Sequence, residues 1–187
     1  MAQSTRTRIT AQAYFQLPDY ATHDLIQLIE GEVILSMPPI LKHQLIVKKI
    51  LSLLEKIEAS NGGVAFPSPT EVKLSESDVY QPDVLYIAQG NMAIAQQDDK
   101  RIIGAPDLVV EVLSPSTAKL DRHQKYNAYE KNGVREYWIV DPLHETIEVW
   151  HRDEAEVFQR QGAFGAEDSF VSLVLETKID VTPLFDV

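Results

Sequence analysis

One segment in the second half of the chain constrains the fold more than any other. Residues 106–113, PDLVVEVL, are aliphatic enough to predict a buried strand. A proline follows, and behind it Ser116 and Thr117 are both suitable N-caps for a helix that runs through Lys131. Residues 136–140 then predict a second short buried strand. A helix placed between two strands in this way is a crossover that returns the chain to the same sheet.

The preceding elements extend this unit. Residues 40–60 carry aliphatic side chains at helical spacing, and residues 64–74 and 82–87 predict strands that form an antiparallel meander with 106–113. The core order is helix, strand, strand, strand, helix, strand, which predicts an α/β or α+β fold: a mixed central sheet with flanking helices. We also expect a short helix capped by Thr10, strands at 25–29 and 32–36, a loop at 89–104, a hairpin of 146–151 with 156–159, and a last strand at 170–175.

The composition suits a single domain over residues 1–187. A chain of this length with 44% hydrophobic residues can build one full core, and nothing in it requires a second. It has no cysteine, which excludes disulfides and thiolate-bound zinc and favours a reducing, cytoplasmic location. The first residues lack the apolar stretch of a secretory signal, and no apolar run reaches the length of a membrane span.

The net charge of −11 opposes non-specific binding of nucleic acid, which usually needs a basic surface. Two stretches depart from this acidic average. Residues 119–135 hold five basic side chains against two acidic ones. A second basic group consists of Lys42, Lys48, Lys49 and Lys56. By count alone, both groups are typical of a solvated helix face.

The strand at 106–113 contains a carboxylate that its neighbours in sequence do not explain. Glu111 lies among large aliphatic residues, where burying an ionised carboxylate is costly. Asp83 begins the adjacent strand of the predicted meander, so both carboxylates can project near one end of the sheet. They repel each other unless a cation lies between them, and Mg²⁺ typically takes one or two carboxylates together with waters and phosphate oxygens. The alternative is two strand-end acids that meet solvent or backbone amides.

A basic residue on the following helix favours the metal interpretation. Helical spacing puts Lys125 on one face with Asp121, Arg122 and Tyr129. From that face a lysine can reach over the end of the sheet, neutralise charge developing on a phosphoryl oxygen and orient an attacking water. The alternative is an ordinary surface lysine.

Five stretches of the chain together resemble a known family. They are GEV at 31–33, PDV at 82–84, PDLVVEVLSPST at 106–117, KYNAY at 125–129 and GVREYWIVDP at 133–142. With the predicted element order, they resemble the PD-(D/E)XK nuclease superfamily, and more closely its Uma-two family, over nearly the whole chain. The resemblance implies a restriction-endonuclease-like fold and a Mg²⁺- or Mn²⁺-dependent endonuclease acting on DNA. Asp83, Glu111 and the carbonyl of Val112 would hold the metal.

The chain departs from the superfamily pattern two residues after Glu111. The superfamily has a lysine there, and this chain has Leu113. A neighbouring strand residue cannot replace it, because successive side chains face opposite sides of a sheet. The resemblance therefore implies a migrated lysine, for which Lys125 is the best-placed candidate, Lys119 the second and Lys73 a more remote third.

Two further residues are candidates for the same site. The resemblance implies that Glu32, which follows a glycine turn, adds an acidic group from the N-terminal strand pair. His43, at the start of the long helix, can also approach the site, although a capping or surface role fits it as well.

Three functions follow from these observations. The leading one is metal-dependent cleavage of DNA, and the second is a non-catalytic binding or regulatory module on a nuclease fold, which the net charge and Leu113 favour. The third, hydrolysis of RNA or a small nucleotide, uses the same site. A homodimer is also expected, because cutting both strands of a duplex needs two sites or a repositioning step. The predicted apolar surface for it is the hairpin with Val149, Trp150, Val157 and Phe158.

Overall fold

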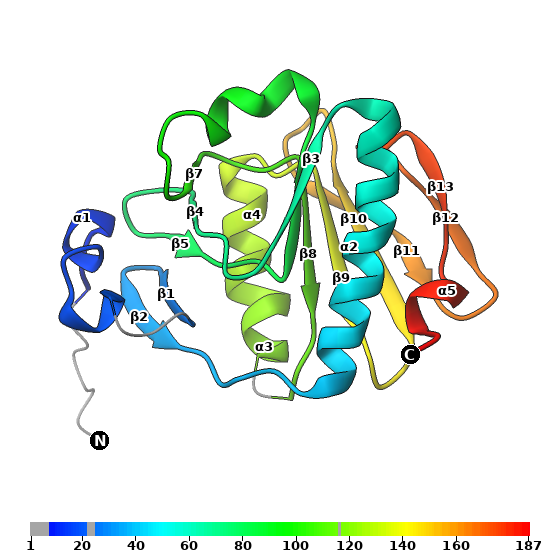
Figure 1. The fold of residues 1–187 in the computed structure, drawn as a ribbon, viewed down its shortest axis with the longest axis horizontal. Coiled ribbons are helices and arrows are strands. Elements are labelled where there is room, and N and C mark those ends of the chain that lie inside the picture. The colour runs from blue at the N-terminus through cyan, green and yellow to red at the C-terminus, as the bar shows by residue number, and fades with distance from the viewer. Residues whose placement is uncertain (1–7, 22–24, 116) are drawn as a thin grey trace.

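The computed structural model describes residues 8–21, 25–115 and 117–187, and its centre is a sheet of six strands (Figure 1). The strand order is β11-β10-β9-β8-β6-β3. The bounds are β3 Val64–Pro67, β6 Val84–Ile87, β8 Leu108–Val112, β9 Glu136–Asp141, β10 Thr146–Arg152 and β11 Phe158–Phe164. The predicted meander is confirmed, because β3, β6 and β8 pair antiparallel. The predicted crossover is confirmed as well, since β8 and β9 pair parallel.

Two helical layers cover the two faces of this sheet. The helix α2 (Leu41–Asn61) lies on one face, and the segment formed by α3 (Ala118–Leu120), a π-helical turn η3 (Asp121–Lys125) and α4 (Tyr126–Asn132) lies on the other. Alternate strand residues divide between these layers. Val110 and Trp138 pack in the core cluster of α2, and Val109 and Tyr137 pack in the cluster of α4. This alternation follows from the pleat of a strand and places Glu111 on the α4 face.

The long helix is built as its periodicity predicts. Ile46, Ile50 and Leu54 are completely buried on one stripe. Burying each such side chain contributes roughly 1.5–3 kcal/mol relative to leaving it exposed. The helix ends at Gly62, whose φ of 70° is the left-handed conformation that glycine adopts at low cost.

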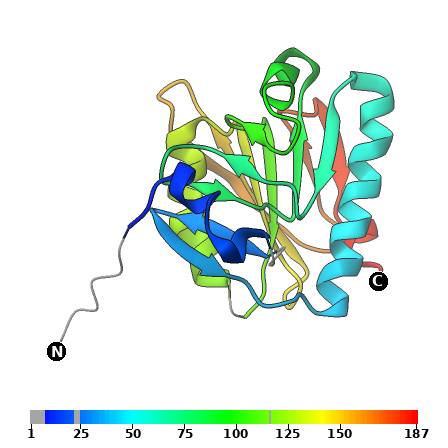
Figure 2. The ribbon, with the colours of Figure 1, turned by 60° about the vertical axis from the view of Figure 1, so that its left-hand side comes forward.

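A second sheet of five strands forms the N-terminal side of the molecule (Figure 2). Its order is β2-β1-β5-β4-β7, with bounds β1 Ile26–Ile29, β2 Glu32–Leu35, β4 Val72–Lys73, β5 Val79–Tyr80 and β7 Ile102–Ile103. The predicted strand pair is confirmed, and its turn holds Glu30 and Gly31 at φ of 50° and 80°. The short helix α1 (Ala11–Tyr14) is confirmed too, with Thr10 Oγ1 accepting from the backbone N–H of Ala13.

Three predicted elements differ from the structure. The strand predicted at 64–74 is broken after Pro67, and its second part joins the other sheet as β4. The loop predicted at 89–104 contains a 3-10 helix, η2 (Gln89–Ala95), and the strand β7. The last strand ends early, because the chain turns after β12 (Ser169–Ser172), pairs back through β13 (Thr177–Asp180) and finishes in α5 (Thr182–Phe185). Another 3-10 helix, η1, spans Pro18–Ala21.

The helix predicted from residue 117 is also more complex than expected. It consists of α3, η3 and α4 rather than one regular helix, and it ends at Gly133 as predicted. Thr117 stands at the N-cap position, but its Oγ1 lies 3.0 Å from Ser114 Oγ instead of bonding the first helical turn. The other predicted cap, Ser116, lies outside the described residues.

The C-terminal hairpin is confirmed, but its predicted apolar surface is wrong. The hairpin β10–β11 pairs onto β9 and so extends the central sheet. Val149 and Phe158 are buried in the two core clusters, and the Trp150 ring packs edge-on against Tyr126. Of the four predicted surface residues, Val157 alone is exposed. These apolar residues complete the core, because layers on both faces of the sheet cover them.

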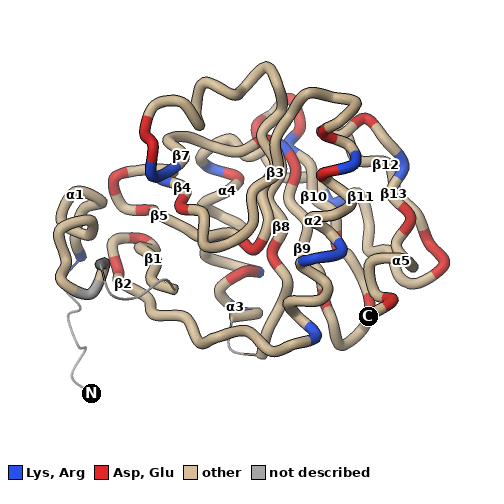
Figure 3. The backbone as a smooth tube through the Cα atoms, viewed as in Figure 1, with Lys and Arg blue, Asp and Glu red and all other residues tan. Residues whose placement is uncertain are grey.

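The basic stretch at 119–135 is not a simple solvated face. Lys125 is buried, Arg122 pairs with Glu148, and Arg135 Nη1 lies 3.1 Å from Asp107 Oδ1. Acidic residues are distributed along most of the backbone (Figure 3). Within the described residues, no helix is both long enough and apolar enough to span a membrane.

Candidate active site

The two predicted acids lie on neighbouring antiparallel strands, as expected. Val84 of β6 is opposite Val110 of β8, so the next positions outward are Asp83 and Glu111. The backbone N–H of Val112 donates to Asp83 Oδ2 at 2.8 Å, which ties the first acid to the strand of the second. The Asp83 side chain is 21% exposed, whereas Glu111 is 2% exposed. The pair therefore has one solvent-accessible member and one buried member.

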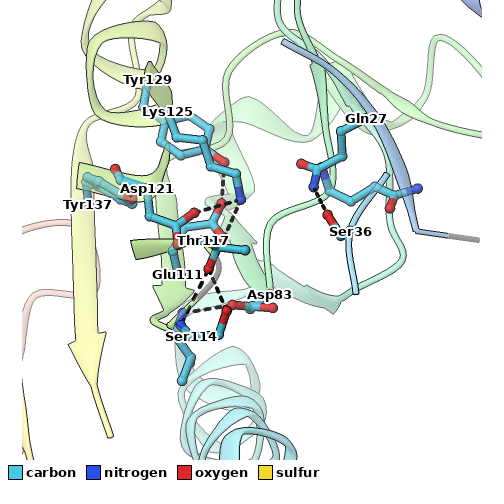
Figure 4. Close-up of polar contacts among 12 residues, drawn as sticks. Gln27, Ser36, Asp83, Glu111, Ser114, Thr117, Asp121, Lys125, Tyr129 and Tyr137 are labelled. Atoms are coloured by element: carbon cyan, nitrogen blue, oxygen red, sulfur yellow. Dashed lines mark hydrogen bonds and ion pairs between the residues drawn. The ribbon is translucent and has the colours of Figure 1, made fainter. Parts of the chain in front are cut away.

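Lys125 reaches Glu111 directly (Figure 4). Its Nζ lies 2.8 Å from Glu111 Oε2 and 3.1 Å from Asp121 Oδ1. The phenol of Tyr129 donates to the other oxygen of Glu111 at 2.6 Å. Lys125 is not the surface lysine of the alternative interpretation, because it is almost completely buried. The carboxylate in the aliphatic strand is thus compensated by an ammonium group and a hydroxyl.

The buried charges perturb one another strongly. Burial raises the pKa of Glu111 to about 8, and the negative charges of Asp121 and Asp83 act in the same direction against the opposing Lys125. Burial alone would lower the pKa of Lys125, but Glu111 and Asp121 outweigh it and hold that pKa above its ordinary value. Two carboxyl groups therefore contact one buried ammonium, and the charge of Asp83 adds to the repulsion that Glu111 meets when it ionises.

His43 belongs to the same cluster. It lies in the first turn of α2, and its Nε2 is 3.2 Å from Asp83 Oδ2. Burial lowers its pKa, but the hydrogen bond and charge of Asp83 outweigh burial and raise the pKa above the ordinary value. The expectation that His43 approaches the site is confirmed, and its neighbour is the accessible carboxylate.

The π-helical turn brings Asp121 and Lys125 to this cluster together. It spans the five residues between α3 and α4, and such turns occur frequently at functional sites. The hydroxyl of Tyr137, from β9, donates to the Asp121 carbonyl at 3.0 Å and so supports the backbone there. Neither Asp121 nor Tyr129 is among the residues predicted for the site. The available signal was their spacing of four residues on either side of Lys125.

The other candidates lie at different places. Glu32 is half-buried at the start of β2, opposite Ile29, and its role stays a prediction. Lys119 is exposed on α3, and Lys73 on β4 pairs with Glu76 at 2.5 Å. Leu113 is buried in the core cluster of α4, so the position of the missing lysine is filled by an aliphatic contact.

The donor set suits one small hard cation. Among the described residues, no group of three or more His, Cys, Asp and Glu side chains could hold a metal ion. A Mg²⁺ site can nevertheless contain only two protein carboxylates, because waters and substrate oxygens supply the remaining ligands. The residues that would hold the ion are Asp83 and Glu111, with the Val112 carbonyl as the predicted third donor. The repulsion that raises the pKa of Glu111 is what a divalent cation would offset.

The described residues also form a cavity elsewhere in the molecule, and it is separate from the cluster of Asp83, Glu111 and Lys125. That cavity has a volume of about 510 Å³ and lies between residues 8–10, the β1–β2 turn and α4. Its lining includes Asp78, Gln124 and Lys131 but neither of the paired acids. The accessible edge of the candidate site is instead Asp83, at the end of a strand.

Comparisons with known proteins agree on the family and the fold. The model of the Uma2 family, described as "Putative restriction endonuclease", matches residues 11–182. The uncharacterized protein sll1609 of Synechocystis sp. is 27% identical over 154 residues, covering 81% of this chain and 85% of that protein. A crystal structure described as a "putative nuclease belonging to DUF820" from Anabaena variabilis superposes with a TM-score of 0.76 at 20% identity. That superposition covers 95% of this chain and 97% of the other, and it shows the same fold.

Proposed function

Because this chain belongs to the Uma2 family of restriction-endonuclease-like proteins, we propose that it is a nuclease that hydrolyses DNA phosphodiester bonds with Mg²⁺ or Mn²⁺. One observation carries the proposal. Asp83 and Glu111 stand opposite each other at the end of β6 and β8, and a lysine ammonium lies 2.8 Å from the second carboxylate. Two acids and a lysine on these elements are the groups that metal-assisted phosphoryl transfer requires.

Each residue has a distinct task in this proposal. Asp83, Glu111 and the Val112 carbonyl hold the ion. When bound, the ion lowers the pKa of water and polarises the scissile phosphate. Lys125 supplies a fixed positive charge for the oxygen on which negative charge develops in the transition state. Glu32, at the start of β2, is the further acidic group that the family resemblance implies.

Asp121 and Tyr129 act through their neighbours. Asp121 holds the Lys125 ammonium together with Glu111, at 3.1 Å. Tyr129 fixes one oxygen of Glu111 at 2.6 Å and leaves the other for the ammonium or the ion. Both are positioning residues, since each fixes the direction of a group that meets substrate or metal.

The direct test is metal-dependent nicking of supercoiled plasmid. Wild-type protein is expected to nick with Mg²⁺ or Mn²⁺ and to stop in EDTA, and Glu111→Gln is expected to be inactive. Glu55→Gln, an exposed position on α2, removes the same charge away from the site and should cut normally. Structured RNA as a parallel substrate distinguishes a deoxyribonuclease from a ribonuclease.

The second candidate is a non-catalytic nucleic-acid or protein-binding module. The observation that favours it is the burial of Lys125, which is engaged with two carboxylates. The net charge of −11 points the same way. Binding of nucleic acid without cleavage under any metal condition would establish this candidate over the nuclease.

A homodimer remains part of the proposal, although Val157 alone of its four predicted surface residues is exposed. Two copies related by a two-fold axis can present one site to each strand of a duplex. Light scattering at micromolar concentration tests it, and a monomer there would contradict it.

A further inference from the structure

Several of the largest exposed aliphatic side chains gather beside the candidate site. Met37, Ile40 and Leu41 are 74%, 64% and 74% exposed, and they lie in and just after the segment that joins β2 to α2. Leu143, in the turn between β9 and β10, is 83% exposed. We call these four residues the aliphatic rim. Single exposed aliphatic residues are ordinary, but a group of them marks an interaction surface.

One contact ties the rim to the site, and a second contact joins the two parts of the rim. One turn beyond Ile40, His43 Nε2 lies 3.2 Å from Asp83 Oδ2. Lys42 Nζ lies 3.2 Å from Glu145 Oε1, which connects the start of α2 to the turn that carries Leu143. Figures 1 and 2 both show the segment between β2 and α2 passing the end of β8 before α2 begins. A partner that binds the rim would therefore lie beside the accessible carboxylate of Asp83.

The charges of the residues near the rim indicate which kind of partner binds there. Residues 33–54 contain no Asp or Glu, in a chain that has 28 acidic residues. The same stretch carries Lys42, Lys48 and Lys49, all exposed. A second copy seated here would bring its own acidic surface but would also cover Asp83. A polyanion gains from Lys48 and Lys49 and meets no acid within residues 33–54, while Glu145, in the turn with Leu143, is paired with Lys42. A nucleic acid substrate would also have to lie beside Asp83 for that residue to act on it.

We propose that the aliphatic rim is a wedge that enters the minor groove of duplex DNA and unstacks a base step beside the scissile phosphate. Lys48 and Lys49 would contact phosphates along the flanking backbone. Minor-groove proteins use Met, Leu and Ile in this way, and the bent duplex then contacts more protein surface. Pro38 and Pro39 restrict the backbone before Ile40, so the wedge is held in place before DNA arrives. This proposal rests on the proposed function, because it assigns how that site receives its substrate.

The test measures unstacking without cleavage. Full-length protein in EDTA is titrated into duplexes that carry 2-aminopurine, whose fluorescence rises when its base unstacks. Wild type is expected to raise the fluorescence, and the double variant Ile40→Ser, Leu41→Ser should abolish the rise and bind about tenfold more weakly, as loss of a wedge predicts. Leu173→Ser, also an exposed leucine but between β12 and β13, is the matched control and should behave as wild type.

The lysines are tested by salt dependence. Lys48→Gln and Lys49→Gln should each reduce the slope of log K against log salt by about 1, and Lys178→Gln on β13 should leave it unchanged. Rim variants that bind and unstack DNA like wild type overturn the proposal, as does wild type that binds no duplex. Sedimentation that shows a wild-type dimer lost in the rim variants assigns the surface to a second copy instead. Wild type that unstacks DNA but never cuts it leaves the wedge standing and refutes the nuclease.

Discussion

Lys125 Nζ lies 2.8 Å from Glu111 Oε2, and both side chains are almost completely buried. Such a pair is costly to build, because both charges leave water. The pair is also not an isolated one, because Asp121 contacts the same ammonium and Asp83 adds a negative charge near Glu111. A chain selected only for stability could place aliphatic side chains at these positions. A role of these charges in a reaction explains why the chain keeps them in spite of the free-energy cost of burying them.

Replacing either acid by its amide should abolish metal-dependent cleavage while the fold remains intact. Glu111→Gln removes a carboxyl group whose ionised form is disfavoured by burial and by the charges of Asp121 and Asp83. Asp83→Asn lowers the repulsion on Glu111 and keeps a side-chain oxygen that can accept from the Val112 N–H. The measurements are nicking rate, Mn²⁺ affinity by calorimetry and thermal unfolding. Either variant cutting at the wild-type rate would remove its residue from the site.

Metal-free stability should fall as the pH rises from about 4.5 to about 8, the ordinary and folded-state pKa values of Glu111. In that range the folded protein keeps a proton that the unfolded chain has released, so each increase in pH favours unfolding. The raised pKa of His43 acts in the same direction. The loss should be on the order of 2–4 kcal/mol in denaturant titrations.

Glu111→Gln is the control for this pH dependence. The amide cannot ionise, so the variant should match wild type at low pH and exceed its stability as the pH rises. A wild-type curve as flat as that of the variant would show that Glu111 stays ionised against Lys125 throughout the range.

Removing the lysine should affect stability and rate together. Lys125→Ala leaves Glu111 and Asp121 buried without a cation, which should cost roughly 3–5 kcal/mol in the metal-free protein. Assayed at saturating metal, where the fold is supported, cleavage should fall by roughly 10²–10³ while Mn²⁺ still binds. Lys125→Met fills the space and separates loss of charge from loss of packing. Lys119→Ala, exposed on α3, is the control, and it becomes the next candidate if Lys125→Ala cuts normally.

The sequence could predict that the two acids and the lysine lie together, because each position depends on a short-range rule. Asp83 and Glu111 meet because two consecutive strands of a meander pair antiparallel. Lys125 faces the sheet because helical spacing puts it with Tyr129 on one side. The place of Asp121 depends on a π-helical turn, which is supported by the Tyr137 hydroxyl from another strand, and no local pattern encodes that contact.

Two other predictions differ from the structure for the same reason, because each depends on contacts between distant parts of the chain. The prolines at 67 and 69 indicate a break, but not that the chain beyond them joins a different sheet. The alternation of apolar and polar residues in the C-terminal hairpin is the same whether a second subunit or other elements of this chain bury the apolar side. Val149 and Phe158 were therefore correctly predicted to need cover, and the source of that cover was wrong.

The two positioning residues should show a specific kinetic signature. Asp121→Asn keeps the shape of the side chain but loses the charge that holds the Lys125 ammonium at 3.1 Å, and Tyr129→Phe loses one hydrogen bond to Glu111. Each should lower kcat about tenfold, the value of roughly one hydrogen bond to a charged group, while KM for DNA changes little. Asp121→Glu should partly restore kcat, since it returns the charge. A purely structural role would instead lower the melting temperature and leave kcat of the folded fraction unchanged. Single-turnover rates normalised to folded protein, measured beside the exposed control Glu55→Gln, separate the two outcomes.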